Sequence, residues 1–67
     1  MNWDQIAGKW KQLKGSIQMK WGDLTNDDID EIRGRNEILL GKIQERYGKT
    51  KEEAQQDIDD WVASLKD

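Results

Sequence analysis

Apolar side chains recur every three or four residues along most of this chain of 67 residues. Residues at that spacing lie on one side of an α-helix. No segment of four or more residues alternates apolar and polar side chains cleanly enough to suggest a strand. The sequence therefore predicts an all-α fold, with helices over about residues 3–21, 26–47 and 51–65. The three apolar stripes are Trp3, Ile6, Trp10, Leu13, Ile17, Trp21 and Leu24; Ile29, Ile32, Leu39, Ile43 and Tyr47; and Ala54, Ile58, Trp61, Val62 and Leu65.

The absence of Cys and His removes most site chemistry. Disulfides, thiolate metal sites, Cys–His pairs and Ser–His–Asp triads are excluded, so we expect no metal, no cofactor and no catalytic site. The acidic run 27–31 lacks the glycine and the spacing of a calcium-binding loop. A chain this short is expected to form one domain, residues 1–67, whose core depends on four Trp and on aliphatic side chains.

Charge and hydropathy limit the partners. The net charge of −3 disfavours a general nucleic-acid binder, which must neutralise several phosphates. No stretch approaches the roughly 18 apolar residues of a membrane span, and the N-terminus lacks the order of a signal peptide. We therefore expect a cytoplasmic protein with no membrane partner and no small-molecule substrate.

The sequence matches itself when it is shifted by 26 residues. Two copies of a helical unit, followed by a C-terminal extension, explain this match better than a solenoid, which needs three or more repeats. The pattern predicts an internal duplication. The identical pairs are Ile6 and Ile32, Gly8 and Gly34, Leu13 and Leu39, Gly15 and Gly41, Ile17 and Ile43, Gln18 and Gln44, and Gly22 and Gly48.

Helix ends are marked by capping residues and by glycines. Capping pairs occur at Asn2 and Gln5, at Thr25 and Asp28, and at Thr50 and Glu53, the last of which is a full capping box. Gly22 and Gly48 are expected to be left-handed C-terminal caps.

Four further glycines lie inside the helical pattern, where each costs about 1 kcal/mol relative to Ala. Gly8 and Gly34 break each unit into a short and a longer helix, giving five helices, if glycine acts here as a breaker. Gly15 and Gly41 either allow another helix of the chain to approach closely or form a docking groove for a partner.

The tryptophans are interpreted as structural. Trp10 and Trp21 are expected in the core, and Trp3 and Trp61, near the chain ends, are expected to close the bundle. The indole N–H groups need partners, for which Gln18 and Gln44 are candidates.

Charges occur in alternating blocks: residues 1–22 and 32–51 are basic, whereas residues 23–31 and 52–67 are acidic. The blocks are explained by helix dipoles and by helix orientation, or else the basic face of residues 9–20 binds an anionic partner. The candidate partner surface consists of Lys9, Lys11, Lys14, Gly15 and Gly41.

Three ordered motifs carry a resemblance to a known family. The segments GKWKQLKG (8–15), WGDLTNDD (21–28) and GKIQERYG (41–48) closely resemble the CsbD-like family of small bacterial proteins. The resemblance implies two roughly orthogonal helical hairpins, in a SAM-domain-like arrangement, and a link to the bacterial general stress response without catalytic activity. It assigns a structural role to the motif residues Trp10, Leu13, Trp21, Gly22, Ile43, Gln44, Tyr47 and Gly48.

Two functions follow as hypotheses. The first is a non-catalytic stress protein, a small hydrophilic helical domain that protects other macromolecules. The alternative is a protein–protein interaction module that binds itself or another protein through the glycine face or the basic patch.

Overall fold

The chain folds into five α-helices in a computed structural model that describes residues 1–65. They are α1 (Trp3–Gly8), α2 (Trp10–Lys20), α3 (Asn26–Ile32), α4 (Asn36–Tyr47) and α5 (Lys51–Ser64). No strand occurs in this part of the chain. The prediction of an all-α fold is confirmed.

Breaks near Gly8 and Gly34 divide the two long helices that the apolar spacing predicts. Continuous helices over 3–21 and 26–47 were therefore wrong, and the five-helix alternative is confirmed. At the second break, Arg33 and Gly34 both have positive φ, at 48° and 77°. A Cβ atom on Gly34 would lie 2.4 Å from the Cα of Ala7. Glycine is thus required at position 34, because the turn packs directly on the backbone of α1.

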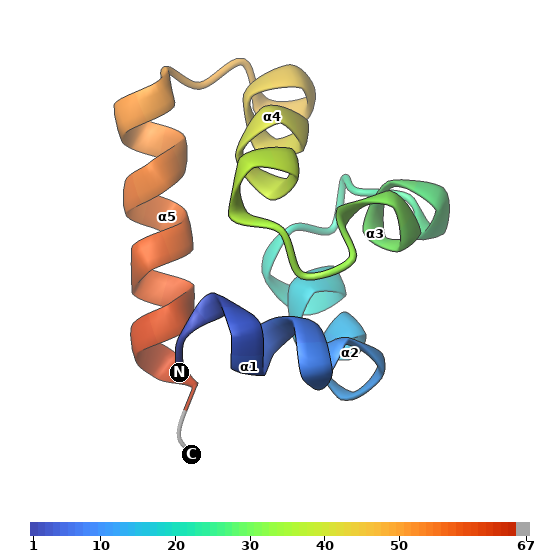
Figure 1. The fold of residues 1–67 in the computed structure, drawn as a ribbon. Helices are drawn as coiled ribbons and strands as arrows, with labels where there is room; N and C mark the ends of the chain where they lie inside the picture. Colours follow the sequence, from blue (N-terminus) through green and yellow to red (C-terminus); the bar gives the residue numbers. More distant parts are fainter. Residues whose placement is uncertain (66–67) are drawn as a thin grey trace.

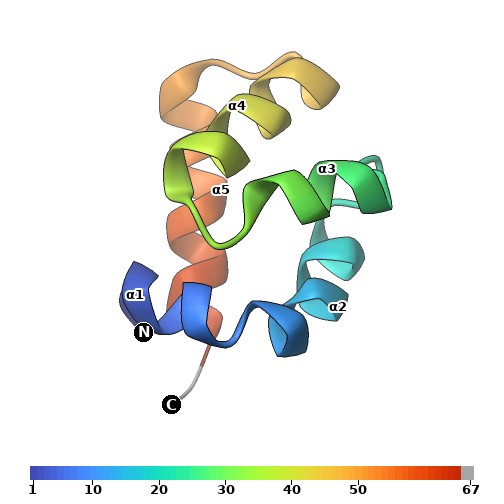
Figure 2. The ribbon, with the colours of Figure 1, turned by 45° about the vertical axis from the view of Figure 1, so that its right-hand side comes forward.

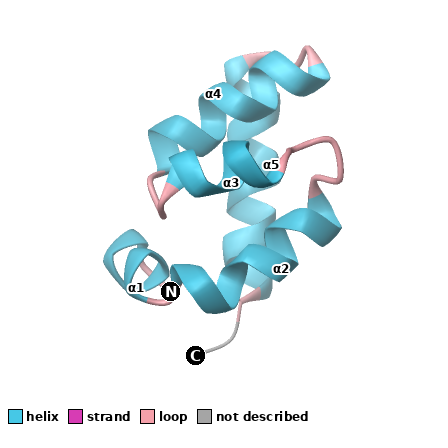
Figure 3. Ribbon diagram, turned by 90° about the vertical axis from the view of Figure 1, so that its right-hand side faces the viewer, coloured by secondary structure: helices cyan, strands magenta, loops and turns pink. Residues whose placement is uncertain are grey.

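The helices form two pairs joined by a fifth helix. Helices α1 and α2 lie at one end of the molecule and α3 and α4 at the other, as all three ribbon views show (Figures 1 to 3). Helix α5 runs past both pairs, from the loop after α4 to the side of α1 (Figure 1). The C-terminal helix therefore connects the two halves of the chain.

Tryptophans organise the core where α5 meets the first helix pair. Trp10 and Trp21 are buried, as expected, and the ring of Trp61 lies 5.9 Å from that of Trp21 and 6.3 Å from that of Trp3. Trp3 and Trp61 thus close the bundle as predicted. The buried hydrophobic side chains are Ile6, Trp10, Ile17, Trp21, Leu24, Ile29, Ile32, Leu39, Leu40, Ile43, Ala54, Ile58 and Trp61.

The indole N–H groups bond to partners other than the predicted glutamines. Trp10 Nε1 donates to the carbonyl oxygen of Ile29 at 3.1 Å, and Trp61 Nε1 donates to Ser16 Oγ at 3.2 Å. Gln18 instead donates to the carbonyl oxygen of Leu24. The expected role of Gln18 and Gln44 was wrong for these two indoles, because α3 supplies the acceptor for Trp10 and α2 supplies the acceptor for Trp61.

All three predicted N-terminal caps form complete capping boxes. At the C-terminal ends, Gly48 is left-handed as predicted, with φ of 64°. Gly22 is not, and that prediction was wrong: α2 ends at Lys20 and Trp21 takes the cap position with φ of −123°. The chain leaves the helix one residue early because the Trp21 ring is buried against Trp61.

Gly15 and Gly41 are not sites of close approach between helices of this chain. A Cβ atom added at either position would meet no atom of the described residues within 4 Å. Both glycines are exposed on helix surfaces. The interpretation of these two positions as internal packing contacts was therefore wrong.

One buried carboxylate ties α3 to α4. Asp28, 4% exposed, accepts from Arg46 Nε at 3.0 Å and Nη2 at 3.2 Å, and its Oδ1 lies 3.2 Å from Lys42 Nζ. It also completes the capping box with the backbone N–H of Thr25. The Arg46 guanidinium, followed by that Thr25 N–H, holds the pKa of Asp28 well below its usual range.

Replacing Gly34 should lower the free energy of unfolding more than replacing any exposed glycine does. We expect Gly34→Ala to lower the free energy of unfolding by more than about 2 kcal/mol, because it adds left-handed strain and a backbone clash. Gly41→Ala is the matched control and should raise it by about 0.5–1 kcal/mol. Urea unfolding followed by circular dichroism measures both. Equal effects of the two substitutions would contradict the assigned Ala7 contact.

The ion pairs of Asp28 with Arg46 and Lys42 should make the stability of the fold depend on pH in the acid range. Since the native pKa of Asp28 lies below its ordinary value of 3.8, its contribution is complete above that pH and is lost as the pH falls below it. Asp28→Asn should lower the melting temperature near neutral pH, because two cations lose a buried partner. It should also flatten the loss of stability below about pH 4.

The matched control for this prediction is Asp30→Asn, which removes the exposed ion pair with Lys14. An exposed pair contributes little, so this variant should melt close to the unaltered protein. Thermal melts of all three proteins between neutral and acid pH provide the measurement. If Asp28→Asn melts no lower than Asp30→Asn, the ion pairs of Asp28 do not stabilise the fold.

Candidate functional site

The predicted partner surface is only partly brought together. Lys9, Lys11 and Gly15 are exposed on α2 or at its N-terminal cap, whereas Gly41 lies on α4, in the other helix pair. Lys14 is half-buried, and its Nζ lies 2.6 Å from Asp30 Oδ1 on α3. Four of the five predicted residues thus belong to one helix, and one of these four is already paired.

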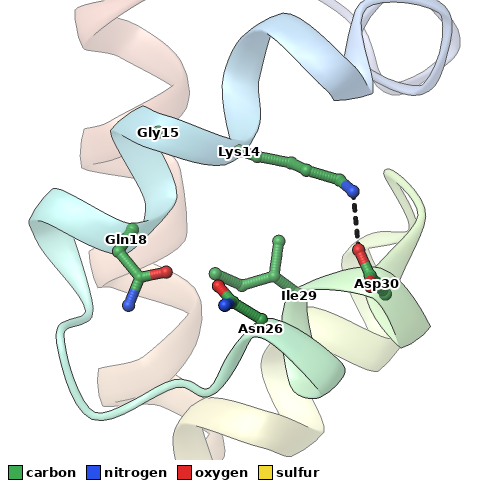
Figure 4. A pocket seen from close by; sticks show the side chains of 6 residues that line it. All are labelled: Lys14, Gly15, Gln18, Asn26, Ile29 and Asp30. Atoms are coloured by element: carbon green, nitrogen blue, oxygen red, sulfur yellow. Dashed lines mark hydrogen bonds and ion pairs between the residues drawn. The ribbon is translucent and has the colours of Figure 1, made fainter.

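A surface groove lies between α2 and α3, beside this basic segment (Figure 4). It has a volume of about 460 Å³ and is lined by Lys14, Gly15, Gln18, Asn26, Ile29 and Asp30. The Lys14–Asp30 ion pair crosses one end of the groove (Figure 4). Gly15 lines the groove from α2 with backbone alone, because it has no side chain.

The groove offers hydrogen bonds rather than reaction chemistry. Its floor is Ile29, which is only 2% exposed, and its walls carry two amide side chains and one ion pair. Amides and a paired lysine bind polar groups, but they supply neither an activated nucleophile nor a general base. The arrangement therefore fits a surface that contacts a polar partner.

Met19 is also exposed on α2, outside the groove, and the sequence analysis missed it. It is 88% exposed, and no other large hydrophobic side chain in residues 1–65 is exposed. The signal was available, because Met19 falls between the positions of the apolar stripe on α2. Lys9, Lys11 and Lys20, on the same helix or its cap, make no ion pair with a side chain of the described residues.

The residues of the family motifs serve mainly the fold. Trp10, Trp21 and Ile43 are buried, and Leu13 is half-buried against the core. The Tyr47 hydroxyl accepts from the backbone N–H of Asp23 at 3.1 Å, which ties the end of α4 to the loop after α2. Of the other motif glycines and amides, Gly48 ends α4, Gly22 is exposed in that same loop, and Gln44 is half-buried.

Ionisable groups with shifted pKa values are engaged elsewhere in the fold. The carboxylate of Glu31, followed by that of Asp28, raises the pKa of Lys42, and the carboxylate of Asp57 raises that of Lys49. Each of these cations joins two segments of the chain. Across residues 1–65, no three acidic side chains are gathered closely enough to hold a metal ion.

None of the helices described is both long and apolar enough to cross a lipid bilayer.

Comparison with known proteins identifies relatives over nearly the whole chain. UPF0337 protein PA4738 of Pseudomonas aeruginosa is 56% identical over 97% of this chain and 100% of its own length. UPF0337 protein RPA4217 of Rhodopseudomonas palustris is 52% identical over 98% of this chain and 100% of its own length. UPF0337 protein YjbJ of Escherichia coli K12 is 49% identical over 91% of this chain and 88% of its own length. No solved structure matches the chain.

The family model described as CsbD-like matches residues 4–56, which include α1 after its first residue, all of α2 to α4 and the beginning of α5. This match covers most of the chain, and the relatives extend it further along α5. The chain belongs to the CsbD-like family.

Proposed function

We propose that this chain is a non-catalytic stress-response protein of the bacterial cytoplasm, which protects other macromolecules as a small folded domain spanning residues 1–67. Membership of the CsbD-like family supports the link to stress that the resemblance implies. The observation that carries the protective role is the surface: Met19 is the single exposed large hydrophobic side chain in residues 1–65. The remaining exposed surface is dominated by charged and amide side chains.

The physical basis for protection is a hydrated surface on a self-contained core. Charged side chains of both signs hold water and resist association, whereas large apolar patches promote it. Such a domain can lie between other proteins as water is lost without joining their exposed apolar surfaces. The mechanism needs no specific ligand, which is consistent with a groove lined by amides and an ion pair.

The arrangement of two related hairpins is part of this proposal. Helix α2 begins at Trp10 and α4 begins at Asn36, so their starts are separated by the 26-residue shift of the sequence repeat. The breaks at Lys9 and at Arg35 have the same offset. These coincidences support an internal duplication in which each copy forms one SAM-domain-like hairpin.

A drying experiment tests the protective role. A labile enzyme dried with a modest molar excess of this protein should retain more activity after rehydration than the same enzyme dried with an equal mass of an inert carrier. Gly34→Ala, held above its own melting temperature before drying, shows whether the folded state is needed. Equal loss of activity with protein and with carrier would exclude the protective role.

The exposed Met19 beside Gly15 favours a second candidate function, an interaction module. A partner bound at this surface should be displaced by Gly15→Leu, which adds a bulky side chain where the fold leaves open space. Affinity capture from stressed cells should recover one stoichiometric partner with the unaltered chain and lose it with this variant. A melting temperature no lower than that of the unaltered chain shows that the variant folds. Identical capture by both proteins would exclude this surface as the binding site.

A further inference from the structure

The outward side of α2 has an uncharged centre with lysines on both flanks. At about 100° per residue, Gly15 and Met19 lie along the middle of the exposed side, with Lys11 on one flank and Lys9 and Lys20 on the other. All five residues are exposed. We call this set the α2 outer face.

Two residues at the centre of this face are not explained by the folding of the chain. Gly15 costs about 1 kcal/mol relative to Ala in a helix interior, yet a Cβ atom there would touch no described residue. Met19 exposes 88% of its surface to water and adds nothing to the core. An open backbone and an exposed thioether side chain together suit close contact with a second helix.

Helix α5 has the complementary outward side. Its midline carries neutral residues, Gln56 and Ala63, and acidic residues lie on both flanks. All of these side chains are exposed, and none of the acidic ones makes an ion pair with a described side chain. The α5 outer face consists of Glu52, Gln56, Asp59, Asp60 and Ala63.

Within one molecule the two faces do not meet. Helix α5 approaches α2 through its opposite side, where Trp61 Nε1 donates to Ser16 Oγ at 3.2 Å. The α5 outer face therefore points away from the α2 helix of its own chain. Only a second molecule can bring the two surfaces together.

We propose that the α2 outer face of one molecule binds the α5 outer face of a second copy of the chain. Met19 and Gly15 contact the neutral midline of α5, while the lysines on either side meet the acidic flanks. The contact joins two different surfaces, so it is heterologous and continues from copy to copy unless the assembly closes into a ring. One helix face on each side buries little area, so the association is weak and depends on concentration.

This proposal rests on the second candidate function, the interaction module, and names a second copy of the chain as its partner. It does not depend on the protective role. A second copy is favoured over nucleic acid by the net charge of −3 and by the matching acidic face on the same chain. Since the flanking charges are exposed, salt should weaken the contact strongly.

Sedimentation of the full chain over a range of concentrations tests the proposal. The mean mass should rise with concentration at about 0.01 M salt, and the rise should disappear at about 1 M salt, where the screening length is a few ångströms. Met19→Gln should reduce the association at low salt. A constant monomer mass at the highest attainable concentration and lowest salt would overturn the proposal.

Charge exchange gives the sharper test. Lys9→Glu with Lys11→Glu, and separately Asp59→Lys with Asp60→Lys, should each abolish association, because each variant carries two faces of like charge. Mixed in equal amounts, the two variants should associate again. Arg33→Glu with Arg35→Glu is the matched control; it has the same change in charge as the first variant, away from both faces, and should associate normally.

Each remaining outcome of these experiments is decisive. The lysine and arginine variants should keep the melting temperature of the unaltered chain, because the substituted positions are exposed. Asp59→Lys with Asp60→Lys removes the hydrogen bonds from Gln55 and Gln56, so it should melt slightly lower while remaining folded at the temperature of the experiment. Failure of the mixed variants to associate, or equal loss in the control, would reject these two faces as the contact. Salt-sensitive binding of a single-stranded oligonucleotide by a chain that stays monomeric would assign the lysines to nucleic acid instead. Capture of a different protein, lost in Gly15→Leu, would preserve the interaction module but exclude the second copy as its partner.

Discussion

The position of Trp61 is the constraint on which the rest of the structure depends. Its ring contacts the rings of Trp3 and Trp21, and its N–H group bonds to Ser16, so one side chain of α5 reaches α1, α2 and the loop after α2. A chain of 67 residues buries only about 60% of its unfolded surface. Without disulfides, such a chain must gain its stability from a few large apolar side chains. The C-terminal helix, which lies outside the sequence repeat, is therefore essential to the packing of the first helix pair.

Polar contacts add to the apolar packing between the second helix pair and α5. Asn36 lies 26 residues after Trp10, and its side-chain amide exchanges two hydrogen bonds of 3.2 Å with the amide of Gln55 on α5. Within that pair, the carboxylate of Asp28 binds two cations from α4. No side-chain nitrogen or oxygen buried within residues 1–65 lacks a hydrogen-bond partner. Both halves pack on α5 through the common hydrophobic core, and the second half adds the amide pair of Asn36 and Gln55.

Local patterns in the sequence predicted what local physics determines. Helical spacing identified every buried hydrophobic position except Leu40, and each Asn or Thr with an acidic or amide side chain three residues later marked a capping box. Long-range contacts decided the rest. Nothing near Gly34 in the sequence indicates that Ala7 lies against it. Trp21, whose ring is buried against Trp61, takes the cap position that the sequence predicted for Gly22. The same limit applies to the surface, where Lys14 was predicted to be available but is paired with an aspartate of another helix.

Glycines that lie 26 residues apart in the sequence have different roles. Some are required by the packing of the chain, and others are not. Gly34 is fixed by the packing of a turn on α1, whereas its counterpart Gly8 has no positive φ and no neighbour that would exclude a side chain. Gly15 likewise weakens α2 without any packing benefit in the described structure. Departures from local consistency that the fold does not use are the expected marks of a functional surface. Gly15 lies beside the exposed Met19 and beside lysines that make no ion pair with a described side chain, and these features are the basis of the contact proposed for this side of α2.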